Sequence, residues 1–142
     1  MKNKNGIVFV SGHLDLTKKE FDEHYRTPIL VALGAGKSFV IGDAKGCDAM
    51  AQRLIDEVLR LDADRQDDDV VVYHMLRKPR NNIGKFSTVG GFKSDEERDQ
   101  EMTFASTEDI AWVRPGREKS GTAKNLARRK SKKEMDDADG LS

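Results

Sequence analysis

The sequence predicts an α/β protein with a Rossmann-like three-layer sandwich, in which helices cover both faces of a parallel sheet of about four strands in the order 3-2-1-4. Three observations predict this fold. Four short apolar runs alternate with helical patterns along the 142 residues. The runs are apolar at nearly every position, as in strands covered on both faces, and loops of small residues follow three of them. Right-handed crossover connections leave few other strand orders, and a chain of this length is sufficient for one hydrophobic core.

The first strand and the first helix are expected in the N-terminal quarter of the chain. Gly6–Val10 is a brief β-branched and aromatic run, which is typical of a strand. Thr17 and Glu20 have the spacing of a capping box, and apolar residues then recur every four positions as far as Leu33. Because Pro28 cannot donate a backbone hydrogen bond, we expect a kink or break in this helix at the two residues before it.

The alternation of strands and helices continues to residue 113. Ser38–Ile41 and Val70–Met75 are the next two expected strands, and Cys47–Val58 between them has the clearest helical periodicity of the chain. A second capping box predicts a helix over Ser94–Ser106. The fourth strand is expected at Ile110–Val113, where turn residues end the apolar run.

Three segments have less regular patterns. The acidic stretch Asp62–Asp69 is interpreted as a solvated connector. Arg77–Lys93 is a long irregular segment with two aromatic residues, Phe86 and Phe92. Either its aromatics stack on a base and its cations pair with a phosphate, or it is a mobile flap with its aromatics tucked into the core. We assign residues 1–130 to the domain and 131–142 to a charged tail. We expect the basic run before the final acidic residues to form a solvated last helical turn, with RNA binding as a minor alternative.

Composition limits the classes of partner and the compartment. The 25 basic and 25 acidic residues cancel, so no overall field attracts the chain to nucleic acid or to an acidic membrane. The first apolar run is too short for a signal peptide or a membrane span. The single cysteine, Cys47, excludes an internal disulfide and is expected in the core, and His13, His24 and His74 are too scattered to indicate a metal. We therefore expect a cytoplasmic protein with no metal and no cofactor, and we do not expect nucleic acid as a partner.

The candidate site is the point where the winding of the sheet reverses. Sheets of this class bind ligands beyond the carboxyl ends of their strands at such a point, here between strands one and four. Three loops of small residues meet there, Ser11–His13, Gly42–Gly46 and Arg114–Thr122. The last of these opens a helix at Ser120, and first-turn amide groups with a partial positive charge suit a phosphate. The other interpretation is that Ser120 only caps the helix and Gly121 only makes a tight turn.

Two other side chains have open interpretations. Arg98 lies on the core-facing stripe of its helix, and an arginine there needs an anionic partner, for which Asp43, Asp99 and a bound phosphate all qualify. His13 lies at a strand tip, where it either contacts a ligand or is merely exposed. Neither a GxGxxG motif nor a Walker lysine loop occurs, so we do not expect a dinucleotide or a nucleoside triphosphate bound in the usual manner.

Four segments carry a resemblance to a known family. The strand followed by SGHLDLT, and then GDAKGCDAMAQ, ERDQEM and SGTAKNLARR, resemble the SLOG superfamily over roughly Gly6–Arg129. This Rossmann-like group includes the LONELY GUY phosphoribohydrolases and the DNA-processing protein of natural transformation, and the chain is most similar to small single-domain members from bacteria and phages. The resemblance implies binding of a nucleotide or nucleotide-derived ligand, with phosphate on Gly121 and Thr122 and sugar or base near Ser11–His13 and Asp43.

One departure from the family pattern concerns the catalytic carboxylate. LONELY GUY enzymes carry a glutamate shortly after the GT pair, whereas AKN follows it here. Cleavage of an N-glycosidic bond passes through an oxocarbenium-like state that a carboxylate stabilises. The related nucleoside deoxyribosyltransferases use a glutamate in their last βα loop, so Glu118 and Asp43 are the candidate catalytic residues, with Asp48 and Asp15 as further carboxylates. The other interpretation of Glu118 is an exposed loop residue.

Two functions of different classes follow. The first is an enzyme that cleaves or transfers at the N-glycosidic bond of a nucleotide, and the second is a non-catalytic nucleotide sensor or binding module. A nucleic-acid-binding module is a third and weaker alternative. We expect a homo-oligomer, because the fourth strand lies at an uncovered edge of the sheet. The candidate ligand-binding residues are Ser11, Gly12, His13, Gly42, Gly46, Asp48, Arg98, Gly116, Ser120, Gly121 and Thr122.

Overall fold

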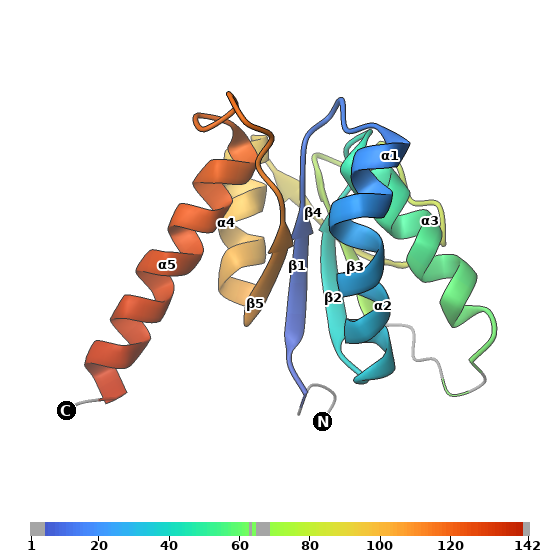
Figure 1. Ribbon diagram of the computed structural model, residues 1–142, viewed down its shortest axis with the longest axis horizontal. Coiled ribbons are helices and arrows are strands. Elements are labelled where there is room, and N and C mark those ends of the chain that lie inside the picture. The colour runs from blue at the N-terminus through green and yellow to red at the C-terminus, as the bar shows by residue number, and fades with distance from the viewer. Residues whose placement is uncertain (1–4, 63, 65–68, 141–142) are drawn as a thin grey trace.

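Five parallel strands form one sheet in the order β4-β3-β2-β1-β5 in the computed structural model, which describes residues 5–62, 64 and 69–140. The strands are β1 (Ile7–Ser11), β2 (Ser38–Gly42), β3 (Val70–Met75), β4 (Ser87–Phe92) and β5 (Glu108–Ala111). The helices are α1 (Lys18–Phe21), the π-helical segment η1 (Asp22–Arg26), α2 (Thr27–Gly34), α3 (Cys47–Leu59), α4 (Asp95–Ala105) and α5 (Gly121–Gly140). Helices cover both faces of the sheet (Figure 1), which confirms the α/β class and the Rossmann-like three-layer sandwich.

The sheet differs from the expected one by an additional edge strand. The four expected strands keep their relative order as β3, β2, β1 and β5, and β4 pairs outside β3. The sequence does not predict β4, because STVGGF contains adjacent glycines and its first five residues are exposed, so no apolar pattern marks it. β5 begins and ends two residues earlier than predicted, which leaves Trp112 and Val113 in the loop after it.

The central strand β1 divides its side chains between the two helical layers. Val8 and Val10 pack into the larger core, together with Tyr25 of η1 and with α3. Phe9, which lies between them in the sequence, packs on the other face against Met102 of α4. This alternation with a period of two is the usual geometry of a strand covered on both faces. It also determines which side chains at the end of β1 face α4 and α5.

The first long helix changes type just before Pro28, at the place where the sequence predicts a break. α1 begins with the expected capping box, because the Glu20 amide donates to the Thr17 hydroxyl and the Thr17 amide donates to the Glu20 carboxylate. Asp22–Arg26 then form the π-helical segment, and α2 starts at Thr27 with Pro28 in its first turn. Since Pro28 has no N–H to donate, the change falls where the helical hydrogen-bond ladder is already interrupted.

η1 joins the ends of β1 and β5 through Tyr25. The hydroxyl of this buried residue donates to the carbonyl oxygen of Ser11 at 2.7 Å and accepts from the Trp112 amide at 2.9 Å. Backbone pairing between the two strands extends to Ser11 and Ala111. The phenol therefore bridges the strands at the end of their ladder.

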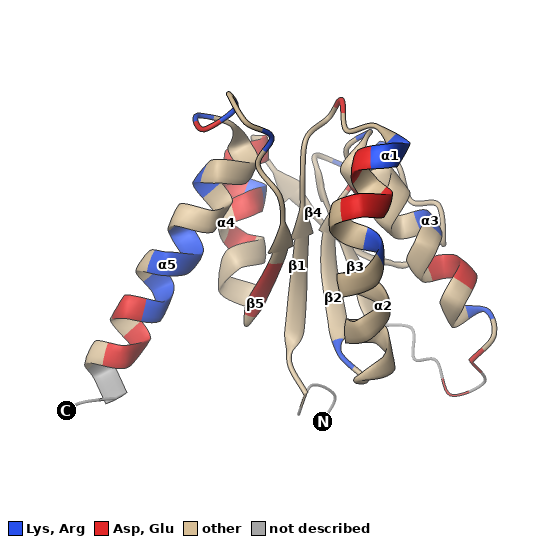
Figure 2. Cartoon of the chain, in the orientation of Figure 1, with Lys and Arg blue, Asp and Glu red and all other residues tan. Residues whose placement is uncertain are grey.

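The C-terminal helix is longer than the sequence predicts. α5 continues to Gly140, so the basic run lies in its middle and acidic residues occupy its end (Figure 2). The expected basic last turn is therefore wrong, and Lys132 instead pairs with Asp136 one turn later at 3.4 Å. Residues 141–142 of the expected tail, and residues 63 and 65–68 of the expected acidic connector, lie outside the described residues.

Candidate functional site

A cavity of about 640 Å³ lies at the carboxyl edge of the sheet. The end of β1 forms part of it, and the loop after β2, the start of α3, one face of α4 and the loop before α5 complete it. From β1 the chain continues to β2 on one side, and the last crossover brings it back to β5 on the other side. The cavity therefore lies at the predicted switch point of the sheet.

Most of the predicted site residues come together in this cavity. Those that line it are Ser11, Gly12, His13, Asp48, Arg98, Gly116, Glu118, Ser120, Gly121 and Thr122. Asp43, Gly42 and Gly46 are not among the described residues that line it. They contact residues that do line it, Arg98 in the case of Asp43 and Gly42, and His13 in the case of Gly46.

The start of α5 presents unbonded donors to the cavity. The Ser120 hydroxyl accepts from the Ala123 amide at 3.2 Å, so Ser120 caps the helix as one interpretation expected. Gly121 and Thr122 follow in the first turn, whose amide groups have no acceptor within the helix and carry a partial positive charge. Within the described residues the Thr122 hydroxyl makes no hydrogen bond, although the residue is buried. This end of the cavity is suited to an anion.

Ser11 lies in the cavity with a hydroxyl that has no partner. Strand alternation directs its side chain to the same face as Phe9, which also lines the cavity. Ser11 is 6% exposed, and its Oγ makes no hydrogen bond with any described residue. A buried polar atom without a partner is uncommon and destabilising. Ser11 is therefore suited to hydrogen-bond with a bound ligand.

His13 is held as a neutral imidazole beside the cavity. The residue is buried, so the interpretation of an exposed loop histidine is wrong. Burial lowers the pKa of His13, and the charges of Arg117 and Arg114 lower it further. Its Nε2 accepts from the Arg114 amide at 2.9 Å. The proton of the neutral ring is therefore on Nδ1, which is the nitrogen able to donate.

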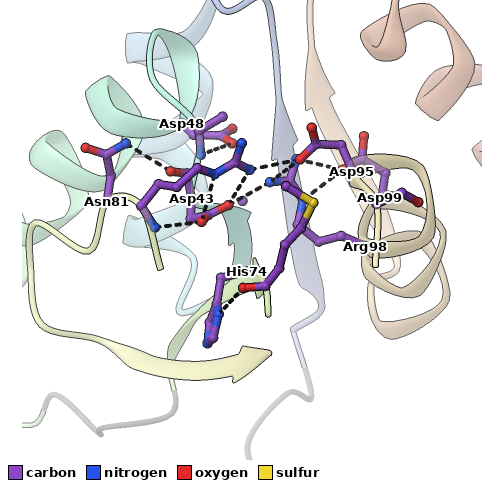
Figure 3. A network of polar contacts seen from close by, with 12 residues as sticks. Asp43, Asp48, His74, Asn81, Asp95, Arg98 and Asp99 are labelled. Carbon is purple, nitrogen blue, oxygen red and sulfur yellow. Dashed lines mark hydrogen bonds and ion pairs between the residues drawn. The ribbon is translucent and has the colours of Figure 1, made fainter. Parts of the chain in front are cut away.

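Asp43 joins two arginines at the centre of a polar cluster (Figure 3). Its Oδ1 accepts from Arg80 Nη2 and Arg98 Nη1, each at 2.8 Å, and its Oδ2 accepts from the amide and Nε of Arg80 at 2.7 and 3.1 Å. Burial raises the pKa of Asp43, but hydrogen bonds from Arg80 and the charges of both arginines outweigh it, so the pKa is lowered. Asp43 is thus an ionised carboxylate with both oxygens occupied.

Arg98 extends from α4 toward Asp43 with acidic side chains around its guanidinium group. Its Nε and Nη2 donate to Asp99 Oδ1 at 3.2 and 3.0 Å, and its Nη1 lies 3.2 Å from Asp95 Oδ1. Asp99 also accepts from Asn125 of α5 at 3.1 Å. Of the partners that the sequence leaves open for Arg98, both aspartates are present. The cluster therefore connects the end of β2 with α4 and α5.

Asp48 is a buried acid that lines the cavity and makes no ion pair with any described residue. Its Oδ2 accepts from the Ala44 amide at 3.1 Å. Burial raises the pKa of Asp48 to about 7, against the opposing charge of Arg98. A Cβ on Gly42 would lie 2.5 Å from Asp48 Oδ2 and 2.9 Å from Arg98 Cζ. The close approach of these two side chains to the backbone therefore explains why residue 42 is glycine.

Steric crowding also explains why residue 46 is glycine. Its φ is +75°, and a Cβ there would lie 2.3 Å from the carbonyl oxygen of Leu14 and 2.6 Å from that of His13. The next amide, that of Cys47, donates to the His13 carbonyl at 3.2 Å. Gly46 thus allows the start of α3 to pack against the loop after β1, which is the loop that carries His13 into the cavity.

Glu118 lies in the loop before α5. It is exposed and lines the cavity, and its Oε2 accepts from the Gly116 amide at 2.7 Å. The carboxylate is thus part of a local turn and also accessible from the cavity. Its position agrees with both interpretations that the sequence leaves open, a loop residue and a site residue.

The segment after β3 is anchored to α3. Gln52 Nε2 donates to the carbonyl oxygens of Gly42 and Asn81, each at 3.1 Å. Phe86 is buried in the core, and Phe92 stacks on Tyr73 with ring centroids 5.8 Å apart. Both phenylalanines thus have partners within the protein. The core position of Phe86 agrees with the interpretation in which the aromatic side chains of this segment are tucked into the core.

The predicted site residues leave out several polar residues of the cavity, including Asp95 and Asn125. Asp95 precedes Arg98 by three positions and therefore shares its helical face. Asn125 is likewise three positions after Thr122. Helical spacing around residues already selected could have identified both.

Comparison of the chain with protein families, with curated proteins and with solved structures finds no match. In the part of the chain that the structure describes, no group of three or more His, Cys, Asp or Glu side chains is placed to hold a metal ion. No helix among the described residues combines the length and apolar composition needed to cross a membrane.

Proposed function

We propose that the cavity binds a nucleotide or nucleotide-derived ligand whose phosphate lies against the start of α5. The observation that carries the proposal is that the first turn of this helix lines a cavity at the switch point of a parallel sheet. The cavity volume of about 640 Å³ is within the range of small-molecule sites. Membership of the SLOG superfamily, which the sequence resemblance suggests, is part of the same proposal.

The cations of the cavity differ in their availability to a phosphate. Arg80 and Arg98 are occupied by the aspartates of the cluster. Lys119 makes no ion pair with any described residue, and Arg117 makes one exposed contact of 3.4 Å with Asp15. Both line the cavity beside the start of α5. Their charges add to the helix terminus in attracting an anion.

We further propose N-glycosidic cleavage as the reaction to test, with Glu118 as the carboxylate that faces the sugar. Glu118 is accessible from the cavity, whereas both oxygens of Asp43 are bonded to arginines. Asp43 then acts as a positioning residue for Arg98. The alternative is a non-catalytic sensor that uses the same cavity. Incubation of bound nucleotides and chromatography for free base separates the two, and Glu118→Gln should abolish turnover without abolishing binding.

Binding itself is tested with Gly121→Glu. Residue 121 has open space where a Cβ would be, and its φ is not in the left-handed region. A carboxylate in the first turn of α5 stabilises the helix by about 0.3–1 kcal/mol and repels a phosphate. We therefore expect unchanged or raised thermal stability together with loss of nucleotide binding. Gly121→Ala is the neutral control, and Thr88→Glu on the exposed edge strand β4 is the control for added charge.

The assay is a thermal-shift screen of nucleoside mono- and diphosphates, ADP-ribose and cyclic nucleotides. A ligand at about 100 times its Kd stabilises the folded state by roughly 2.7 kcal/mol, which is measurable. The proposal predicts a shift in the wild type and in both controls, and no shift in Gly121→Glu. No shift from any compound in the wild type would contradict it, as would equal binding by Gly121→Glu.

A further inference from the structure

The two ends of the cavity have opposite electrostatic character. The start of α5 provides amide donors together with Lys119 and Arg117. At the other end, Asp43, Asp48, Asp95 and Asp99 surround two guanidinium groups, those of Arg80 and Arg98 (Figure 3). With every carboxyl group ionised, negative charge is in excess there. A ligand that fits both ends has an anion at one end and hydrogen-bond donors at the other.

Asp48 is the buried acid of this group with an available oxygen, whereas Asp95, whose Oδ1 contacts Arg80 and Arg98, is 57% exposed. Asp43 has both oxygens bonded to arginines, and Asp99 accepts from Arg98 and Asn125. Asp48 Oδ2 accepts from the Ala44 amide, while its Oδ1 accepts no hydrogen bond from any described residue. Asp48 is 7% exposed and lines the cavity. A carboxyl oxygen that faces a cavity and has no protein donor is available to accept a hydrogen bond from a ligand.

Ser11 supplies a second, independent indication of a ligand. Its Oγ is buried and has no partner among the described residues. Ser11 ends β1, which lies between β2 and β5. Asp48 follows β2 and the start of α5 follows β5, so Ser11 lies between the acidic and the anion-binding ends. Neighbouring strands are about 4.8 Å apart, so the two ends are about two strand spacings apart, and we place the sugar of the nucleotide between them, over Ser11.

We propose that Asp48 determines base specificity, with its Oδ1 accepting a hydrogen bond from an exocyclic amino group of the bound nucleotide. This inference rests on the proposed function, because the phosphate at α5 determines which end of the ligand reaches Asp48. The ligand class is a nucleotide with an amino-bearing base, such as adenine or cytosine. An oxo base would place a carbonyl oxygen against the carboxylate, which leaves two acceptors facing each other without a proton.

The test compares ligands that differ in this one group. Adenosine and inosine monophosphates form one pair, and cytidine and uridine monophosphates form a second. Binding of each to the full chain is measured by calorimetry at pH 8, because burial raises the pKa of Asp48 to about 7 and the acid must be ionised. We expect the amino member of at least one pair to bind 10-fold or more tightly than its oxo partner.

Asp48→Asn gives a sharper expectation than loss of binding. The Ala44 amide needs an acceptor, so the asparagine oxygen must face it and the NH₂ group must face the cavity. The preference should therefore reverse, and the oxo member should bind more tightly. Glu57→Gln removes one charge from the exposed face of the same helix, outside the cavity, and should leave the wild-type ratio within about twofold.

The outcomes separate this inference from the proposed function. Equal binding of both members of each pair in the wild type would overturn the role of Asp48 and leave nucleotide binding intact. A ratio that is unchanged in Asp48→Asn would also overturn it. If none of the four monophosphates binds while another phosphorylated ligand of the screen does, only the specificity inference fails. If no phosphorylated ligand binds, both proposals fail.

Discussion

Removal of the Asp43 carboxylate tests whether the arginine cluster holds the fold together. In Asp43→Ala, Arg98 loses a 2.8 Å partner while remaining buried, and the three contacts from Arg80 also disappear. Breaking a buried ion pair costs about 3–5 kcal/mol. Arg98 keeps Asp99, and Arg80 is half-exposed and can be hydrated, so the expected loss is near the lower limit. Unfolding by urea should therefore show a decrease of about 3 kcal/mol, and the melting temperature should fall by roughly 6–12 °C.

The matched control is Asp95→Ala. Asp95 contacts the same two arginines at 2.8 and 3.2 Å, but its side chain is 57% exposed, so its loss should cost at most about 1 kcal/mol. Circular dichroism during urea unfolding measures both variants. If Asp43→Ala is destabilised no more than Asp95→Ala, burial does not strengthen the pairing and the reasoning is refuted.

Three further predictions concern Asp48, Gly46 and Tyr25. The raised pKa of Asp48 means that the folded state binds more protons than the unfolded state between about pH 4 and pH 7, so stability falls as pH rises through this range. Asp48→Asn should reduce the dependence of the free energy of unfolding on pH by up to about 1.4 kcal/mol per pH unit, measured by urea unfolding. An unchanged pH dependence would show that the acid is ionised throughout this range. Gly46→Ala should lower the free energy of unfolding by more than about 2 kcal/mol, because it combines a positive φ with a clash against the Leu14 carbonyl; a smaller loss in thermal melts would mean that the loop adjusts. Tyr25→Phe leaves the Trp112 amide without its acceptor and should cost about 1–3 kcal/mol, measured by tryptophan fluorescence during unfolding, and unaltered stability would contradict the bridging role.

Local patterns predicted the parts of the fold that depend on local physics. The periodicity that begins at Cys47 marks α3 within one residue of its observed end, and the proline at position 28 marks the change of helix type. β4 could not be predicted, since an exposed edge strand with adjacent glycines has neither an apolar run nor alternation. The end of α5 was missed for a related reason: charged residues alone do not distinguish a solvated helix from a tail.

In the site, too, some features could be predicted from the sequence and others could not. The loops of small residues, which are visible in the local sequence, and the switch-point rule, which follows from strand order, together located the cavity. The role of Asp43 depends on partners 37 and 55 positions away, Arg80 and Arg98, and no local pattern indicates which carboxylate they would bind. Gly42 likewise is a predicted ligand-binding residue, whereas the groups that approach it in the structure are the side chains of Asp48 and Arg98.

The Tyr25 bridge links one core layer to the backbone at the ends of β1 and β5. Its ring belongs to the core beneath α1 and α3, yet its hydroxyl bonds to backbone atoms of Ser11 and Trp112 at the entrance to the opposite layer. The spacing of β1 and β5 at the cavity is therefore maintained by a residue that is not among the described residues that line the cavity. Variation in the packing of η1 would tune the width of the site while leaving its chemistry unchanged.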